Sequence, residues 1–143
     1  MICKKKLIYK RGAAAVEFAI ILPILISLVL GICEFGFLLY NQQVITNASR
    51  EGARAGIVSR PPTARLPDPN IEGVVDDYIK GRLVTFGGAD PNNLKTTVSR
   101  AGVNVGDDLT VTVTYDYRFF VIPEFIPVFN PYQITARTVM KYE

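Results

Sequence analysis

One acidic side chain, Glu17, stands near the start of the most apolar stretch of the sequence, and its carboxylate is the first group whose chemistry needs an explanation. No other charged residue occurs between Ala13 and Cys33. An ionised carboxylate costs about 2.5–3.5 kcal/mol at the centre of a membrane helix and less near its edge. A carboxylate at this position therefore needs a compensating interaction.

Two interactions would compensate for the charge of Glu17. In the first, Glu17 lies in the first turns of a helix, where the helix dipole favours an anion, and extends to the headgroups near Lys10 and Arg11. In the second, a cut after Gly12 creates a cationic α-amine on Ala13. Glu17 of one chain then neutralises the amine of a neighbour when the helices pack side by side. The residues alone leave both interpretations open.

The apolar run itself predicts a membrane-spanning helix. At about 1.5 Å of rise per residue, the run from Ala13 to Cys33 extends for about 30 Å, which matches the thickness of the hydrocarbon core. Five basic residues precede Gly12, and the next basic residue in the chain is Arg50. By the positive-inside rule, this asymmetry places the N-terminus in the cytoplasm and the C-terminal part outside it. A cleaved secretory signal is disfavoured because its apolar core is shorter, about 7–15 residues.

Charge and composition argue against several classes of function. Five of the 16 basic residues precede Gly12 and all 13 acidic residues follow it, so the part outside the membrane is slightly acidic and a nucleic-acid partner is not expected. The chain has no histidine, and its two cysteines lie at opposite ends of the span, which removes the usual ligands of zinc, haem and iron–sulfur clusters. The outer carboxylates form no recognisable catalytic set. We therefore expect no metal, no cofactor and no enzymatic activity.

The helix is expected to continue beyond the membrane through residue 58. Asn41, Gln42 and Gln43 indicate a watery environment beyond the span. Apolar residues of this extension fall near one face at helical spacing, namely Phe37, Tyr40, Val44, Ala48 and Ala55.

Small and charged residues of this extension are candidates for an interface. Ala48, Gly52 and Gly56 form a stripe at four-residue spacing, which allows another backbone to approach closely. Outside the membrane, this stripe receives either another chain or the chain's own sheet. The nearby charged residues form either a solvated cluster or pairs across subunits, and they are Arg50, Glu51 and Arg54.

The rest of the chain predicts a small α+β outer domain. A proline-rich linker precedes an amphipathic helix that begins at Asp68 and ends at Gly87. The economical arrangement is a three-stranded antiparallel sheet whose apolar face covers the long helix and the second helix. The strands are expected at Leu94–Arg100, over the two-residue alternation from Leu109 to Phe119, and at Tyr132–Tyr142.

One connection in the outer domain is unusually hydrophobic. The segment from Phe119 to Tyr132 either caps the domain core with its aromatic residues or forms an exposed contact for a neighbouring subunit or the membrane surface. This segment belongs to the outer domain. The sequence predicts that the chain divides into a leader (1–12), a membrane helix (13–33), a helical extension (34–58), a linker (59–70) and the outer domain (71–143).

Short motifs around the apolar run carry a resemblance to known proteins. The sequence "KRG" followed by "AAAVEF" resembles the type IV prepilin processing site, in which Gly12, Ala13, Glu17 and Phe18 occupy the matching positions. The wider stretch from Arg11 to Val58 is similar to TadE/TadG-like pseudopilins of the tight-adherence (Flp) pilus system. Its matching motifs include "EFG", which begins at Glu34, and "REGARA", which begins at Arg50. Phe37 departs from the family, because many members carry a polar or basic residue there.

The resemblance implies a function in pilus assembly. It implies a minor pilin or pseudopilin in the inner membrane of a bacterium, cut after Gly12 by an aspartate prepilin peptidase. Its partners would be that peptidase, membrane lipid, and other pilins and the assembly platform of a homo- or hetero-oligomeric filament. The alternative is an unprocessed, permanently anchored protein that binds a partner through its outer domain. The residues with an implied role in processing or assembly are Gly12, Ala13, Glu17, Phe18, Glu34, Arg50, Glu51, Gly52 and Arg54.

Overall fold

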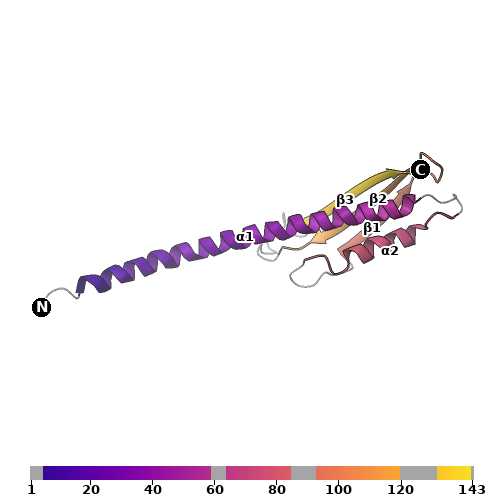
Figure 1. Cartoon of the computed structure of the whole chain (residues 1–143). Coiled ribbons are helices and arrows are strands. Elements are labelled where there is room, and N and C mark those ends of the chain that lie inside the picture. The colour runs from indigo at the N-terminus through magenta and orange to yellow at the C-terminus, as the bar shows by residue number, and fades with distance from the viewer. Residues whose placement is uncertain (1–4, 59–63, 85–92, 120–131, 143) are drawn as a thin grey trace.

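The longest element is a helix, α1 (Lys5–Ile57), which contains the apolar run and continues into the outer domain. The computed structural model describes residues 5–58, 64–84, 93–119 and 132–142, with the backbone alone for residues 5–11. Figure 1 shows that the N-terminal half of α1 extends away from the other elements, whereas its C-terminal half lies against them. One uninterrupted helix therefore joins the predicted membrane helix to its predicted extension.

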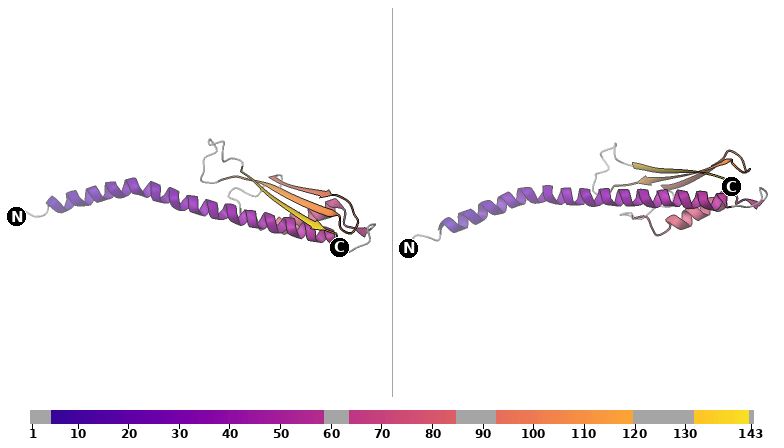
Figure 2. Two further views of the ribbon diagram at one scale, coloured as in Figure 1. Left: turned by 90° about the horizontal axis from the view of Figure 1, so that it is seen from above. Right: turned by 45° about the horizontal axis from the view of Figure 1, so that its top comes forward.

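A proline interrupts the hydrogen bonding of α1. Pro23 lies inside the helix and lacks a backbone N–H. The hydroxyl of Ser27 donates a hydrogen bond of 2.8 Å to the carbonyl oxygen of Pro23, one turn away. The views of Figure 2 show that the projecting half of α1 is curved. Because proline is among the few established causes of a bent helix, we attribute this curvature to Pro23.

Within its described residues, the outer domain adds one helix and three strands in two layers. They are α2 (Asp68–Ile79), β1 (Leu94–Arg100), β2 (Asp108–Tyr117) and β3 (Tyr132–Lys141). The strands form one antiparallel sheet in the order β1-β2-β3. α1 contacts β2 and β3, α2 contacts β1, and the two helices contact each other. The predicted α+β fold, with its three-stranded antiparallel sheet, is confirmed.

The central strand β2 shows why the alternation in the sequence produces this packing. Successive side chains of a strand point to opposite faces of the sheet. The threonines of β2 are half-buried on the outer face, while the apolar side chains between them are fully buried against the helices. The buried set is Leu109, Val111, Val113, Tyr115 and Tyr117.

Contacts between β2 and α1 show that the two elements run in opposite directions. Leu109 at the start of β2 packs near Gly56 at the end of α1, and Val111 lies near Gly52. At the other end, Tyr117 is hydrogen-bonded to Glu34. The last residues of β2 and, through strand pairing, the first residues of β3 therefore lie at the end of the domain that is nearest to the projecting half of α1.

The second helix is shorter than expected. The prediction that it continues to Gly87 is wrong, because α2 ends at Ile79 and the chain turns at Gly81 with φ of 73°. Glycine adopts this left-handed conformation without steric cost. Leu83 still packs against the core from outside the helix, so its helical spacing was misleading. Residues 59–63 of the linker and 120–131 of the hydrophobic connection lie outside the described residues.

Candidate functional site

The projecting half of α1 exposes apolar side chains on all sides. Between Gly12 and Cys33, every residue except Leu22 is exposed, and Leu22 is half-buried. Within the described chain, α1 is the helix that is long and apolar enough to cross a membrane, and its most apolar part is not buried by the protein. A helix that is apolar all round needs lipid or other helices around it. α1 is thus a candidate membrane span, consistent with anchoring by a single pass.

The predicted processing site lies in the backbone of α1. Gly12 and Ala13 are both helical and exposed. A Cβ atom added at Gly12 would meet no other atom within 4 Å, so packing does not require a glycine here. Glycine inside a helix is less favourable than alanine by about 0.8–1.0 kcal/mol. The peptide bond after Gly12 is therefore at an accessible and locally weakened point of the helix.

Glu17 and Phe18 follow within the next two turns. Both side chains are exposed. No hydrogen bond or ion pair joins Glu17 to another of the side chains that the structure describes. Within a single chain, the carboxylate therefore stands on an apolar helix surface next to an exposed aromatic ring.

Glu34 is buried, although it directly follows the apolar run. Its side chain is 4% exposed, and the hydroxyl of Tyr117 donates a hydrogen bond of 2.9 Å to its Oε1 atom. Burial, the hydrogen bond to Glu34 and its carboxylate charge together raise the pKa of the Tyr117 hydroxyl above its ordinary value of 10.0. Glu34, which the sequence suggested for an interface between subunits, thus joins α1 to β2 of the same chain.

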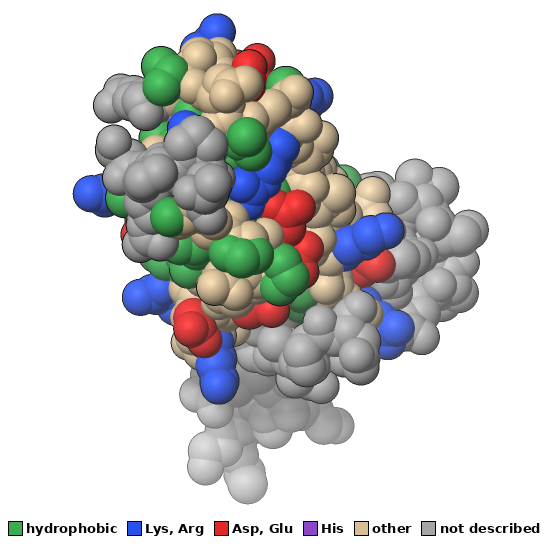
Figure 3. All heavy atoms as spheres, turned by 90° about the vertical axis from the view of Figure 1, so that its right-hand side faces the viewer, with side chains coloured by type: hydrophobic (Ala, Val, Ile, Leu, Met, Phe, Trp, Pro, Cys, Tyr) green, Lys and Arg blue, Asp and Glu red, His purple; other side chains and the backbone are tan. Residues whose placement is uncertain are grey.

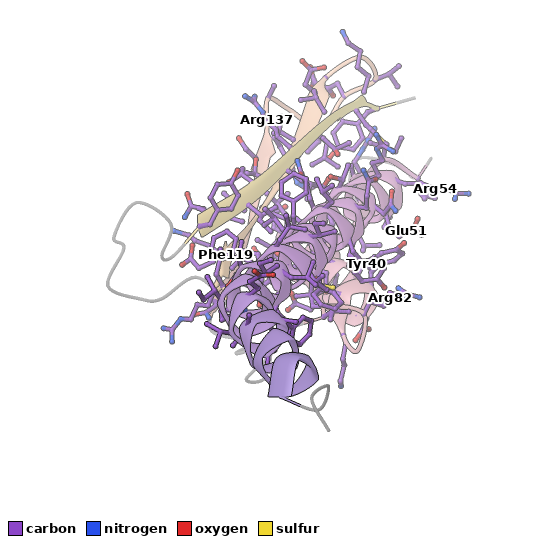
Figure 4. All side chains as sticks on the ribbon, turned by 90° about the vertical axis from the view of Figure 1, so that its left-hand side faces the viewer. Tyr40, Glu51, Arg54, Arg82, Phe119 and Arg137 are labelled. Carbon is purple, nitrogen blue, oxygen red and sulfur yellow. The ribbon has the colours of Figure 1, made fainter. Side chains whose placement is uncertain are left out.

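Unlike Glu34, the other three charged residues of the helical extension face solvent. Arg50, Glu51 and Arg54 are exposed, and none forms an ion pair with another described side chain. In Figure 4, the side chains of Glu51 and Arg54 project from α1 into solvent. These three residues are on the part of α1 that its own outer domain leaves uncovered.

Gly52 lies in the core of the molecule. A Cβ atom at this position would lie 2.5 Å from Cγ2 of Val75 in α2. A Cβ atom at Gly56 would collide with side-chain atoms of Leu109 and Ile71, and Ala48 is fully buried. Outside the membrane, the stripe of small residues therefore receives the chain's own second helix and sheet.

A comparison with protein families identifies this part of the chain. Residues 12–54 match the model of a family described as TadE-like protein. Over these residues, the chain is similar to the TadE-like family. The resemblance predicted from the sequence is therefore confirmed over this segment, which begins at the predicted processing site. No curated protein and no solved structure matches the chain.

All the residues that the sequence suggested for processing or assembly fall within the TadE-like segment, but the structure does not bring them together. Gly12 and Glu17 lie on the projecting half, Glu34 lies at the junction with the outer domain, and Arg54 lies on the far part of α1. They are spread along one helix, whose rise is about 1.5 Å per residue. The TadE-like segment is thus an extended surface rather than a compact site.

The residues that hold the outer domain on the TadE-like helix were missed by sequence analysis. Asn41 is fully buried, so the expectation that it faces water is wrong, whereas Gln42 and Gln43 are exposed. The side-chain amide of Asn41 donates a 2.8 Å hydrogen bond to the carbonyl oxygen of Val84 and accepts a 2.9 Å bond from the N–H of Val84. The seven-residue spacing from Glu34 places Asn41 on the same helix face, and this was the available signal.

A second polar contact lies further along the same helix. Ser49 is fully buried, and its hydroxyl lies 2.7 Å from the hydroxyl of Thr138 in β3. Glu34, Asn41 and Ser49 thus each form a hydrogen bond to a different segment of the outer domain. Buried polar groups are costly unless they are paired, so these three contacts favour one alignment of the domain along α1.

The far end of the domain carries mixed charge. Arg100 donates a 2.6 Å hydrogen bond to Asp68 and a 3.2 Å bond to the hydroxyl of Tyr142, which fixes the start of α2 to the sheet. Figure 3 shows this end with acidic and basic side chains interspersed. Among the residues described, no three histidine, cysteine, aspartate or glutamate side chains form a group that could hold a metal ion.

Proposed function

We propose that this chain is a minor pilin or pseudopilin of a Flp (tight-adherence) type IV pilus system, cut by a prepilin peptidase after Gly12. The observation that carries the proposal is the TadE-like match, which begins at Gly12 and covers the apolar half of α1. The TadE-like family points to a protein associated with the Tad pilus and is not a family of enzymes. The exposed apolar surface of α1 supports the finer role in assembly.

The two halves of α1 suit a subunit that moves from the membrane into a filament. The outer half is covered by α2 and the sheet, whereas the projecting half exposes apolar side chains on all sides. Lipid covers such a surface in the membrane, and packed helices of other subunits cover it in a filament. Because both environments are apolar, transfer between them requires no change in the outer domain.

Glu17 provides the polar interaction that aligns neighbouring subunits. After a cut at Gly12, the α-amine of Ala13 is cationic and lies about one helical turn from Glu17. In lipid, the exposed carboxylate has a cost of up to about 2.5–3.5 kcal/mol. Pairing with the amine of a neighbouring chain offsets this cost and fixes the stagger between helices. An apolar residue of similar size could not provide this alignment.

The leader gives the chain its orientation. Lys4, Lys5, Lys6, Lys10 and Arg11 keep the N-terminus in the cytoplasm of a bacterial cell, where prepilin peptidases find their substrates. The outer domain then lies on the periplasmic or extracellular side. There, the exposed Arg50, Glu51 and Arg54 are available to the assembly platform or to other pilins.

Replacement of Glu17 tests the proposed assembly mechanism. We expect Glu17→Ala to be cut and inserted normally but to remain in the membrane as an unincorporated monomer. The matched control is Asp77→Ala, which removes an exposed carboxylate from α2 and should leave incorporation unchanged. Both variants are compared by their distribution between the inner membrane and the sheared surface fraction. Normal incorporation of Glu17→Ala would contradict the mechanism and favour a permanently anchored protein.

A further inference from the structure

The end of the outer domain that is nearest to the projecting half of α1 carries exposed aromatic and basic side chains. Phe119 forms edge-on ring contacts with Tyr117 and Tyr132, at centroid distances of 5.2 Å and 6.1 Å. Tyr132 is 46% exposed, Phe119 is half-buried, and Arg118 is exposed. We call Arg118, Phe119 and Tyr132 the membrane-proximal rim.

The hydrogen bond between Tyr117 and Glu34 determines where this rim lies along α1. Glu34 directly follows the apolar run, and the 2.9 Å bond places the end of β2 at the same level. Tyr132 is the strand partner of Tyr117, so the start of β3 lies at that level too. The rim is therefore level with the outer boundary of the candidate span and not further out along the helix.

The exposed apolar surface of α1 continues past this level. Phe35, Leu39 and Tyr40 are all exposed. Beyond Glu34, the first exposed polar side chain of α1 is that of Gln42. The helical rise from Glu34 to Tyr40 corresponds to about 9 Å. This length is close to the headgroup layer on one side of a bilayer, about 5–8 Å. The rim and the last apolar turns of α1 thus occupy the same layer.

We propose that the membrane-proximal rim rests in the phospholipid headgroup layer of the membrane that α1 spans. The chemistry fits, because tyrosine and other aromatic rings favour the membrane interface and an arginine pairs with lipid phosphate. Figure 4, viewed along α1 from its N-terminal end, shows Phe119 on one side of the helix and Tyr40 on the other. Lipid contacts on two sides hold the outer domain against the bilayer. This inference rests on the single-pass anchoring in the proposed function.

Tryptophan fluorescence tests this placement directly, because the chain contains no tryptophan. The full chain is reconstituted in vesicles of phosphatidylcholine and phosphatidylglycerol, with or without phosphatidylcholine brominated near the top of its acyl chains. The test variant is Tyr132→Trp, and Phe119→Trp repeats the measurement at the adjacent ring. Phe35→Trp marks the outer end of the span. Val105→Trp, at a position that is 76% exposed in the turn between β1 and β2, marks the far end of the domain.

The proposal predicts that the indoles at positions 132 and 119 lose about the same fraction of their fluorescence as the indole at position 35. The indole at position 105 should lose none. Quenching at position 35 with none at position 132 would contradict the placement of the rim in the headgroup layer, while the proposal that α1 spans the membrane would stand. No quenching at position 35 would contradict the span itself, and the rim with it. Circular dichroism of Tyr132→Trp establishes that the variant is folded, since its half-exposed ring can be enlarged without overpacking the core.

A second variant tests whether the hydrogen bond from Tyr117 holds the rim in place. Tyr117→Phe in the Tyr132→Trp background removes the bond to Glu34 and keeps the ring. We expect this change to reduce the quenching at position 132 and leave the quenching at position 35 unchanged. Equal quenching at position 132 with and without the hydroxyl would contradict this positioning role.

Discussion

At the scale of single residues, the buried pair of Glu34 and Tyr117 joins the long helix to the central strand. A buried carboxylate without a donor incurs a large desolvation cost, and the hydroxyl of Tyr117 supplies a donor at 2.9 Å. A hydrogen bond to a charged group contributes about 1.5–3 kcal/mol. We therefore expect Tyr117→Phe to lower the free energy of unfolding by about this amount, measured by urea denaturation of the full chain in detergent.

The matched control for this variant is Tyr132→Phe, which removes a hydroxyl from a half-exposed ring at the same end of the sheet. Its effect should be within about 0.5 kcal/mol, as for most surface substitutions. Equal stability of Tyr117→Phe and the native chain would contradict the role assigned to the hydrogen bond.

The same tyrosine gives the protein a sensitivity to alkaline pH. Since the pKa of Tyr117 is raised in the folded state above its ordinary value of 10.0, the folded protein holds this proton more tightly than the unfolded chain does. The resulting stabilisation is complete below pH 10.0 and is lost as the pH rises through the folded pKa. The melting temperature of the native chain should fall more steeply above pH 10.0 than that of Tyr117→Phe. Parallel curves for the two proteins would contradict the assignment.

Alanine substitutions at two glycines of α1 distinguish the effect of close packing on stability from the effect of helix propensity. Gly52→Ala places a methyl group against Val75, and overpacking of this kind costs about 1–3 kcal/mol. Gly36→Ala places a methyl group where no atom lies within 4 Å, and the better helix former should stabilise the fold by about 0.4–1 kcal/mol. Thermal unfolding of both variants checks the prediction. A Gly52→Ala variant as stable as Gly36→Ala would show that the close contact between α1 and α2 is absent.

At the scale of elements, the last turn of α2 is electrostatically unfavourable. Partial desolvation of this largely exposed carboxyl, followed by the charge of Asp77, raises the pKa of Asp76 above its ordinary value of 3.8. The turn contains no basic residue, and the negative end of the helix dipole adds to the repulsion. Because the folded pKa is raised, protonation of Asp76 favours the folded state, and this stabilisation is lost as the pH rises through the folded pKa.

Asp76→Asn should therefore melt at a higher temperature than the native chain at neutral pH. Well below pH 3.8 the two proteins should differ least, since Asp76 is then protonated in both the folded and unfolded states of the native chain. Differential scanning calorimetry at the two pH values measures the effect. A lower melting temperature for the variant at neutral pH would show that the charge of Asp76 is stabilising after all.

The elements themselves were largely predictable from the sequence because their patterns are local. The apolar run predicted the long helix, and the alternation from Leu109 predicted the central strand with its buried face. The end of α2 was not predictable from spacing, because Leu83 keeps the helical period outside the helix. The pairing of Glu34 with Tyr117 joins residues 83 positions apart, and no local pattern contains such information. The TadE-like motif predicted a role for Glu34 at an interface but did not identify Tyr117 as its partner.

At the scale of the whole molecule, one helix connects two environments. The projecting half of α1 is the candidate membrane span, and the outer half is the central support of the outer domain. Glu34, Asn41 and Ser49 fix the domain along this helix by hydrogen bonds. A force or displacement applied to the projecting half is therefore transmitted to the domain through a single continuous element.

The state of the mature N-terminus tests the proposed function most directly. The protein is isolated from the native membrane fraction, and its first residue is determined by intact mass and N-terminal sequencing, with Gly12→Val as the control. We predict a chain that begins at Ala13 and a control variant that retains the leader. A native chain that begins at Met1, in cells with an active prepilin peptidase, would contradict the proposal and identify a permanently anchored protein.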